Sequence, residues 1–300
     1  MPEKEWLAYV NGEYVPQSEA KVSIFDHIVL YGDGVFDTLC SKNGYIFKVE
    51  EHLDRLYRSA HAFLIEVPVT KEELRKIILK VVETNSAPDQ YIKVLVTRGV
   101  GPRPLLSPAG CVPGLIVFSR PGLSSVDPER EGKEIRAMIV SVRRTPPECL
   151  DPKVKCLNYA NQVMAKIEAM NAGMDEAIFL DLAGYVNEAT AYSIFIVRKG
   201  VLYTPPADAI LQSVTRETVF EIAEKASIKA VEYRLTPYDL YTAEELFFAG
   251  TAGGIVPISS VDGRRIGDGK PGMITKKIAR LYWDILASGV HGTKYRVRKS

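Results

Sequence analysis

The chain has 300 residues, of which 46% are hydrophobic and 25% are charged, a composition typical of a globular protein. Its 38 Lys and Arg residues nearly balance its 37 Asp and Glu residues, so the sequence offers no extended basic surface for nucleic acid or for a membrane. The four cysteines and four histidines show neither CxxC spacing nor a ligand pair, which argues against disulfides and against a metal site.

The sequence shows no targeting or membrane-spanning segment. The N-terminal residues lack the apolar core of a signal peptide, and charges such as Lys93 and Arg98 interrupt the long apolar runs. We therefore expect a cytoplasmic protein. The length exceeds the size at which one hydrophobic core usually keeps growing, which predicts two domains.

The first domain, predicted over residues 1–120, is a small α+β unit. Asn11-Gly12 separates two strand-like runs, and this dipeptide favours a tight hairpin turn. Two later segments repeat apolar residues at helical spacing, and Thr70 with Glu73 forms a capping-box pattern before the second of them. The predicted strands are 6–10, 13–15, 91–97 and 114–119, and the predicted helices are 50–64 and 71–84.

Residues 121–132 are rich in Pro, Gly, Ser and charge, which indicates an interdomain linker. The second domain, predicted over 133–290, is larger and contains many β-branched and aromatic runs that favour strands. Residues 291–300 form a basic tail that we expect to be solvated. The predicted strands are 135–142, 177–181, 193–197, 230–233, 246–249 and 255–261, and the predicted helices are 158–172, 215–227 and 273–288.

Lys155 and Glu188 are the first candidates for chemistry. Lys155 precedes a predicted helix, and Glu188 follows a strand and a turn. A lysine amine that condenses with an aldehyde, together with an acid set against a pyridine nitrogen, is the pair that pyridoxal phosphate chemistry needs. On their residue types alone, both side chains could equally be solvated surface charges.

Several motifs follow one another in an order that is specific where each motif alone would be weak. They resemble the fold type IV pyridoxal phosphate enzymes, which include branched-chain amino acid, D-amino acid and (R)-selective amine transaminases and the aminodeoxychorismate lyases. The resemblance covers about residues 6–286 and implies a two-domain α+β fold. The motifs are Asp26, Tyr31-Gly32-Asp33-Gly34-Val35-Phe36, Glu51-His52-Leu53-Asp54-Arg55-Leu56, Lys155 to Tyr159, Asp175-Glu176-Ala177, Glu188, Val214-Thr215-Arg216 and Gly250-Thr251-Ala252.

The resemblance implies that the cofactor is pyridoxal 5'-phosphate and that Lys155 is both its Schiff-base lysine and the catalytic base. It assigns Glu188 to the pyridine nitrogen, Tyr159 to the phenolate oxygen and Leu211 to the underside of the ring. A helix N-terminus suits a phosphate dianion. The residues implied for the phosphate are Arg55, which points away from the apolar stripe of its predicted helix, Val214 and Thr215 at a helix start, and Thr251.

The resemblance also implies a substrate pocket. The backbone amides of Thr251 and Ala252 would receive the α-carboxylate, and Tyr31 would reach across from a partner subunit, so we expect a homodimer or a higher oligomer. Arg98 lies in a segment like the one that supplies a carboxylate-trapping arginine in D-amino acid transaminases. The implied substrate residues are Tyr31, Phe36, Thr38, Tyr91, Arg98, Thr251 and Ala252.

The chain departs from the usual branched-chain pattern at several positions. Asp37-Thr38-Leu39-Cys40 replaces a Glu-Gly-Ile-Arg run, and Lys93 stands where an arginine is common. Ser213 replaces a glycine before the phosphate amides, which predicts weaker cofactor binding because a side chain is added to a tight turn. Residues 189–193 also differ from the typical Gly-Ser-Gly-x-Asn run.

From these features we predict a transaminase that moves an amino group between branched-chain L-amino acids and a 2-oxo acid such as 2-oxoglutarate by a ping-pong mechanism. A D-amino acid or (R)-selective amine transaminase is the alternative. An aminodeoxychorismate lyase is disfavoured because Thr251 stands where such lyases carry asparagine. A non-catalytic binding homologue is the remaining alternative, favoured only by the departures around Ser213 and after Glu188.

Overall fold

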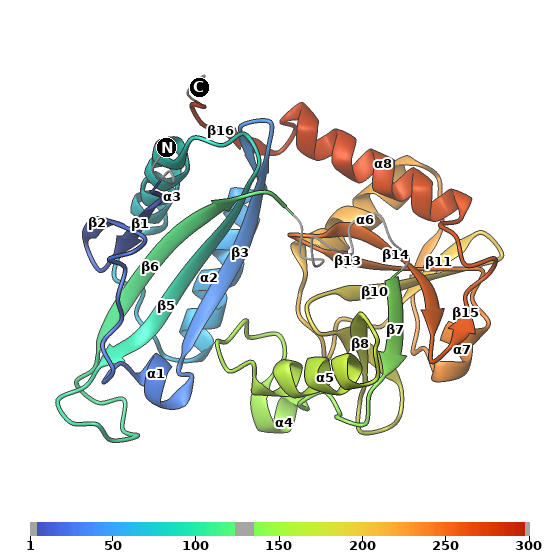
Figure 1. The fold of residues 1–300 in the computed structure, drawn as a ribbon, viewed down its shortest axis with the longest axis horizontal. Coiled ribbons are helices and arrows are strands. Elements are labelled where there is room, and N and C mark those ends of the chain that lie inside the picture. The colour runs from blue at the N-terminus through green and yellow to red at the C-terminus, as the bar shows by residue number, and fades with distance from the viewer. Residues whose placement is uncertain (1–4, 124–134, 298–300) are drawn as a thin grey trace. The chain divides into compact units, whose positions relative to one another are not determined.

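The computed structural model describes residues 5–123 and 135–297, and the chain divides into two compact units (Figure 1). The first unit comprises Met1–Leu123, Val154–Tyr159 and Leu286–Ser300, and the second comprises Ser124–Lys153 and Ala160–Ile285. The predicted first boundary lies close to the observed one. The segment that carries Lys155 and the C-terminal residues differ from the prediction, because both belong to the first unit. Most of the predicted linker lies outside the described residues.

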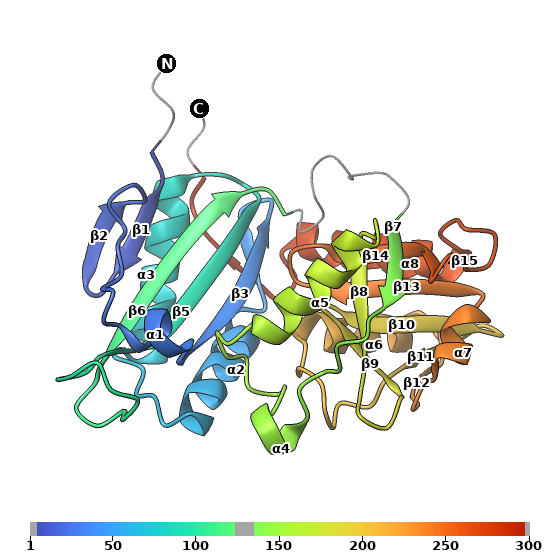
Figure 2. The same ribbon diagram turned by 60° about the horizontal axis from the view of Figure 1, so that its bottom comes forward.

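The first unit is an antiparallel sheet with two helices on one face (Figure 2). Helix α2 (Val49–Ala62) packs on β3, and α3 (Lys71–Asn85) packs on β6 and β1. A short helix, α1 (His27–Tyr31), precedes β3. The strands bond in the order β16 (Gly292–Lys294), β4 (Tyr45–Phe47), β3 (Gly34–Lys42), β5 (Gln90–Val100), β6 (Val112–Pro121), β1 (Leu7–Val10) and β2 (Glu13–Pro16).

The local predictions for this unit are confirmed where the pattern was strong. Asn11 and Gly12 both have positive φ, 49° and 105°, as the tight turn between β1 and β2 requires. The Thr70–Glu73 capping box starts α3. The core lies between the helices and the sheet, and its fully buried members include Leu53, Leu56, Leu74, Ile78, Val81, Ile92 and Val94.

The basic tail is not simply solvated. Gly292–Lys294 forms β16 on the edge of β4, and Tyr295 is only 4% exposed. The Tyr295 hydroxyl lies 2.7 Å from the Ser41 hydroxyl and donates to the Ala87 carbonyl over 2.6 Å. The expectation of a frayed end was wrong for these residues because a short edge strand needs a partner and the tyrosine fills the core.

The second unit is strand-rich, as predicted, with a mixed sheet. Helix α5 (Ala160–Asn171) packs on β8 and α6 (Val214–Lys225) packs on β13, while α4 (Pro147–Leu150), α7 (Pro237–Tyr241) and α8 (Met273–Ser288) complete the helices described. The strands bond in the order β12 (Ala230–Glu232), β11 (Val201–Thr204), β10 (Ser193–Arg198), β13 (Glu245–Gly250), β14 (Gly254–Val261), β7 (Ile135–Ile139), β8 (Glu176–Leu180) and β9 (Val186–Ala189), with β15 (Arg264–Arg265) beside β14.

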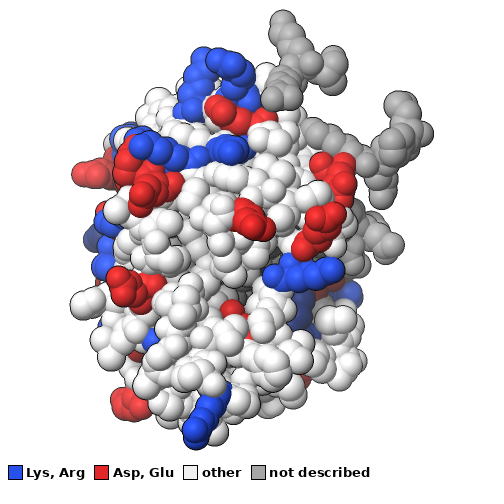
Figure 3. All heavy atoms as spheres, turned by 90° about the vertical axis from the view of Figure 1, so that its left-hand side faces the viewer, with Lys and Arg blue, Asp and Glu red and all other residues white. Residues whose placement is uncertain are grey.

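Charge is dispersed on the face drawn in Figure 3. Lys and Arg side chains are scattered among Asp and Glu side chains, and wide areas carry no charge. This pattern agrees with the net charge of +1. Among the described residues, no helix is both long and apolar enough to span a membrane.

Candidate active site

Lys155 lies in an extended segment that pairs with the start of β3. The Phe36 amide donates to the Lys155 carbonyl over 2.9 Å, and the Leu157 amide donates to the Gly34 carbonyl over 2.8 Å. The Lys155 amide donates to the Ser59 hydroxyl of α2 over 3.1 Å. The sequence places this lysine at the mouth of a helix, but α5 begins later because these bonds keep the preceding residues extended. A strand and a helix of the first unit therefore fix the lysine backbone.

Gly34 is required at this junction. A Cβ atom on Gly34 would lie 2.8 Å from the Val96 carbonyl oxygen and 2.9 Å from Cδ1 of Leu157. Both distances are shorter than normal contacts, so the close approach of the two segments depends on the missing side chain. A larger residue would push the segment that carries Lys155 away from β3.

The Lys155 amine lies beside an aromatic ring. Its Nζ atom is 4.6 Å from the centre of the Phe36 ring, within cation–π range. The Tyr159 ring meets the Phe36 ring edge-on, with 5.2 Å between their centres. Lys93 on β5 places its own Nζ 4.5 Å from the centre of the same ring. Phe36 thus brings the predicted Schiff-base lysine, Tyr159 and a second lysine together.

Strand register gathers the predicted pocket residues on one face of the first sheet. Thr38 lies opposite Lys93, and Tyr91 lies two residues before Lys93 on β5. Directly opposed residues point to the same side of a sheet, and alternate residues along a strand share a side. These three therefore share a face with Phe36. Asp37 points to the opposite face, against which α2 packs.

Arg55 is buried, although its position on the helix suggested a solvated side chain. Its Nε donates to Asp37 Oδ2 over 2.8 Å and its Nη2 donates to Asp37 Oδ1 over 2.7 Å. His52 Nδ1 lies 2.7 Å from the same Oδ1 atom. His52, Arg55 and Ser59 recur at i, i+3 and i+7, so they form a buried polar stripe beside the apolar one. This spacing, together with Asp37, was the overlooked signal.

The Asp37 group is a buried ion pair with a neutral neighbour. Burial would raise the pKa of Asp37, but the charges of Arg55 and His52 and their hydrogen bonds hold that pKa well below its ordinary value. Burial lowers the pKa of His52, against the opposing effect of Asp37, and the charges of Arg55 and Lys155 lower it further. Asp37 is therefore an anion at neutral pH, and His52 is a neutral ring whose Nδ1–H donates to it.

Glu188 lies in β9 of the second unit and is 8% exposed. Its Oε1 accepts from Arg144 Nε over 2.6 Å, and its Oε2 accepts from the Leu211 amide over 3.3 Å. Two predicted cofactor residues, Glu188 and Leu211, are thus in contact. Arg144 was missed, because a lone arginine in a sequence is most often a solvated surface residue. The carboxylate is held by a cation and a main-chain donor.

Val214 and Thr215 are the first residues of α6, as the sequence predicts. The amides of a first helical turn have no acceptor within their helix. Together with the positive end of the helix dipole, they suit an anion such as a phosphate. Thr215 is buried at this position, with 2% exposure.

Two departures from the family pattern fit this fold without strained backbone. Ser213 has a φ of −83°, and its hydroxyl accepts from the Arg216 amide over 3.2 Å, so it is the N-cap of α6. The Thr190 hydroxyl donates to Glu176 Oε1 over 2.6 Å in the altered loop after Glu188. The turn therefore does not require glycine, and the argument for weaker cofactor binding from a strained serine fails.

Thr251 and Ala252 form the turn between β13 and β14. Gly250 pairs with Gly254 across this turn. A Cβ atom on Gly254 would lie 2.5 Å from the Trp283 ring, and its φ of 61° also favours glycine. The shape of the turn is therefore fixed, with Thr251 and Ala252 half-buried in it.

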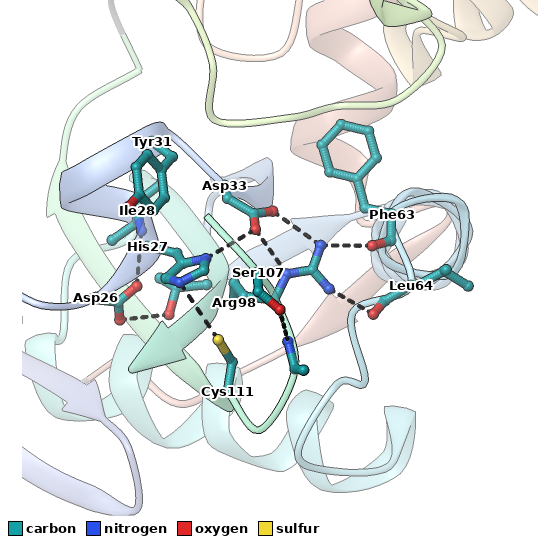
Figure 4. A network of polar contacts seen from close by, with 12 residues as sticks. Asp26, His27, Ile28, Tyr31, Asp33, Phe63, Leu64, Arg98, Ser107 and Cys111 are labelled. Carbon is teal, nitrogen blue, oxygen red and sulfur yellow. Dashed lines mark hydrogen bonds and ion pairs between the residues drawn. The ribbon is translucent and has the colours of Figure 1, made fainter. Parts of the chain in front are cut away.

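Arg98 is engaged inside its own unit (Figure 4). Its Nε and Nη2 donate to Asp33 over 2.8 and 3.1 Å, Nη2 also donates to the Phe63 carbonyl over 2.7 Å, and Nη1 donates to the Leu64 carbonyl over 2.7 Å. Nearby, the Tyr31 ring meets the His27 ring edge-on, 5.0 Å between centres. The structure does not support Arg98 as a carboxylate-trapping residue, because its donors are already used.

Comparison with known proteins places this geometry in a family. A family model described as amino-transferase class IV matches residues 34–261. A putative branched-chain-amino-acid aminotransferase of Methanocaldococcus jannaschii is 47% identical over 279 residues, which are 92% of this chain and 95% of that protein.

Solved structures agree. The branched-chain aminotransferase of Thermoproteus uzoniensis with norvaline matches with a TM-score of 0.87 at 36% identity and 96% coverage of both chains. A branched-chain amino acid aminotransferase from the source abbreviated T.th., with pyridoxamine 5'-phosphate, matches with a TM-score of 0.90 at 32% identity, over 97% of this chain and 99% of that one. These matches confirm the predicted α+β fold type IV architecture. The chain belongs to the class IV aminotransferases.

Proposed function

We propose that this protein is a pyridoxal 5'-phosphate-dependent transaminase that moves amino groups between branched-chain L-amino acids and a 2-oxo acid such as 2-oxoglutarate. The observation that carries the proposal is Lys155, whose backbone is fixed by Phe36 and Ser59 while its amine lies against the Phe36 ring. The names of the similar proteins support the choice of substrate.

The residues present fit the cofactor. A fixed lysine is available for the aldehyde, and the Glu188 carboxylate, held by Arg144 and Leu211, is a suitable partner for a protonated pyridine nitrogen. The amides that open α6 suit the phosphate. Asp37 holds the Arg55 guanidinium in one orientation, so Arg55 can supply a fixed positive charge to the same phosphate.

When bound, the cofactor ring withdraws electrons from the substrate α-carbon, which makes the proton on that carbon acidic. Lys155 Nζ is the base that takes up this proton and delivers it again. Glu188 keeps the pyridine nitrogen protonated throughout. The amides of Thr251 and Ala252 bind the α-carboxylate and orient the α-carbon toward the lysine. The two half-reactions use the same groups in opposite directions, which gives a ping-pong cycle.

The pocket face of β3 and β5 supports an apolar donor side chain. Phe36 and Tyr91 provide aromatic surface, and Thr38 is small. Lys93 lies on the same face and can meet the second carboxylate of an acidic acceptor as a point charge. The alternative, a D-amino acid transaminase, loses its main argument because Arg98 is bound to Asp33.

We further propose a homodimer. The segment around α1 exposes several large apolar side chains, among them Ile24 at 70%, Phe25 at 53% and Val29 at 57%. Clustered apolar exposure of this kind marks an association surface. The surface adjoins Tyr31, which the family resemblance assigns to a neighbouring subunit's pocket. The same proposal places the enzyme in the cytoplasm.

A donor panel tests the proposed substrate. Purified protein loaded with pyridoxal 5'-phosphate is titrated separately with L-leucine, D-alanine and (R)-1-phenylethylamine while the visible absorbance of the bound cofactor is recorded. L-leucine alone should convert the visible band to that of the amino form of the cofactor. Conversion only by D-alanine or by the amine would replace the branched-chain proposal with one of its alternatives. Absence of any bound-cofactor band would refute the enzyme proposal itself.

A further inference from the structure

Arg98 and Asp33 form a doubly paired contact. Beyond the two side-chain hydrogen bonds, the Arg98 amide donates to the Asp33 carbonyl over 3.1 Å. Their side chains are 12% and 23% exposed, so the pair is only partly screened by water. All but one of the N–H groups of the guanidinium have acceptors, since Nη1 and Nη2 also reach two carbonyls.

These contacts join two elements that carry pocket residues (Figure 4). Asp33 lies in the turn between Tyr31, which ends α1, and Gly34, which starts β3. Phe63 and Leu64 follow the C-terminal end of α2, where helix carbonyls lack internal donors and the helix dipole favours a cation. Arg98 therefore holds the turn after Tyr31 to the end of the helix that carries Arg55 and Ser59.

The turn itself fixes the groups on both of its sides. Asp33 Oδ2 lies 3.5 Å from His27 Nδ1, and His27 Nε2 lies 3.6 Å from Cys111 Sγ. The His27 ring in turn supports Tyr31 edge-on. On the other side, Phe36 follows within β3 and its amide bonds to the Lys155 carbonyl. A shift of Asp33 is thus transmitted to Tyr31 and to the lysine segment.

We infer that Arg98 is a positioning residue of the substrate pocket, which it holds through Asp33, and is not the group that binds a substrate carboxylate. If Arg98 turned toward a substrate, it would leave a half-buried Asp33 carboxylate and two carbonyls without their donor. The inference rests on the proposed function for its kinetic test, although its structural consequence does not.

The decisive comparison is between Arg98→Met and Asp33→Asn, because the two roles predict opposite effects for the aspartate. As a positioning pair, both single variants lower kcat, by about tenfold, with the same factor for 2-oxoglutarate and for 4-methyl-2-oxopentanoate. The double variant should be no worse than the poorer single one, since both remove the same contact. Arg98→Lys should behave like Arg98→Met, because lysine cannot bridge four acceptors.

As a carboxylate receptor, Arg98 would behave differently. Asp33→Asn would then release its positive charge and lower KM for the 2-oxo acids, whereas Arg98→Met would raise KM with little change in kcat. That result, or an Arg98→Met enzyme with unchanged kinetics, overturns the inference. Arg58→Met, which removes an exposed guanidinium from α2, is the matched control and should leave both constants unchanged.

Hydrogen exchange in the cofactor-free protein separates this inference from the proposed function. Both variants should speed amide exchange across residues 26–36 relative to wild type and to Arg58→Met, while circular dichroism shows an unchanged fold. Unchanged exchange in this segment contradicts the positioning role. If the wild-type protein lacks transaminase activity, the proposed function fails, and the exchange experiment still decides whether Arg98 holds the turn.

Discussion

At the scale of single residues, the proposed chemistry depends on side chains that hold other side chains. Glu188 is held by Arg144, Arg55 by Asp37, and the Lys155 amide by Ser59. Each holding residue is buried or nearly so, and each has a polar partner. Fixed orientation matters because small displacements of reacting groups cost rate.

Arg144→Met removes the cation from the buried Glu188 carboxylate. Loss of one partner of a buried pair costs about 3–5 kcal/mol, so we expect a large drop in the free energy of unfolding and weaker retention of pyridoxal 5'-phosphate. Urea unfolding and cofactor titration measure the two effects. Arg143→Met, at the exposed neighbouring position, is the control and should change stability by less than about 0.5 kcal/mol. Equal effects at both positions would contradict the assignment.

His52 should make stability depend on pH. Its pKa is lowered in the fold, chiefly by burial, so the unfolded chain takes up the proton first as the pH falls. The stability that neutral His52 supports is complete above about pH 6.5 and is lost below it, with a slope of at most about 1.4 kcal/mol per pH unit.

The test compares wild type with His52→Gln, which keeps a donor for Asp37. Thermal unfolding between pH 8 and pH 5.5, about the range over which a free histidine titrates, should show a smaller loss of Tm in the variant. Asp37 does not contribute in this range, because its pKa lies well below its ordinary value and its stabilisation is lost only in stronger acid. Parallel Tm curves for the two proteins would contradict the neutral state of His52.

At the scale of elements, the start of α6 combines helix capping with anion binding. Ser213 caps the helix through the Arg216 amide. Ser213→Ala should therefore lower the free energy of unfolding by about 1 kcal/mol, and Ser213→Gly, the family's usual residue, by only a few tenths. Neither change removes the amides of Val214 and Thr215, so pyridoxal 5'-phosphate affinity should stay within about threefold. Much tighter cofactor binding by the glycine variant would restore the view that the serine weakens the site.

The predictable elements were those with strong periodic or capping signals. The α3 helix with its Thr70 cap and the hairpin at Asn11-Gly12 follow from local rules. By contrast, β9 and β16 are short and lack alternation, so their strand form depends on neighbours distant in sequence.

The candidate site was predictable only in part. The motif residues could be named because their order resembles a family. The partners Arg144 and Asp37 could not, since an ion pair across separate elements leaves no periodic trace. Burial of Arg55 contradicted helical spacing for the same reason.

At the scale of the whole molecule, the proposal predicts a dimer formed through the apolar surface near α1. Val29→Glu puts a charge into that surface and should give monomers by light scattering, with most of the activity lost. Leu182→Glu, at a 70% exposed apolar position of the second unit, is the control and should leave the assembly unchanged. A dimer that persists unchanged in Val29→Glu would show that subunits associate elsewhere.

The central claim is that Lys155 carries the cofactor, and reductive trapping tests it most directly. Protein incubated with pyridoxal 5'-phosphate is treated with borohydride, which makes a lysine linkage permanent, and is then digested and analysed by mass spectrometry. The account predicts a phosphopyridoxyl group on Lys155 at a stoichiometry near one per chain, and none in Lys155→Ala. Labelling mainly at another lysine, such as the nearby Lys93 or Lys153, or full labelling of the alanine variant, would contradict it.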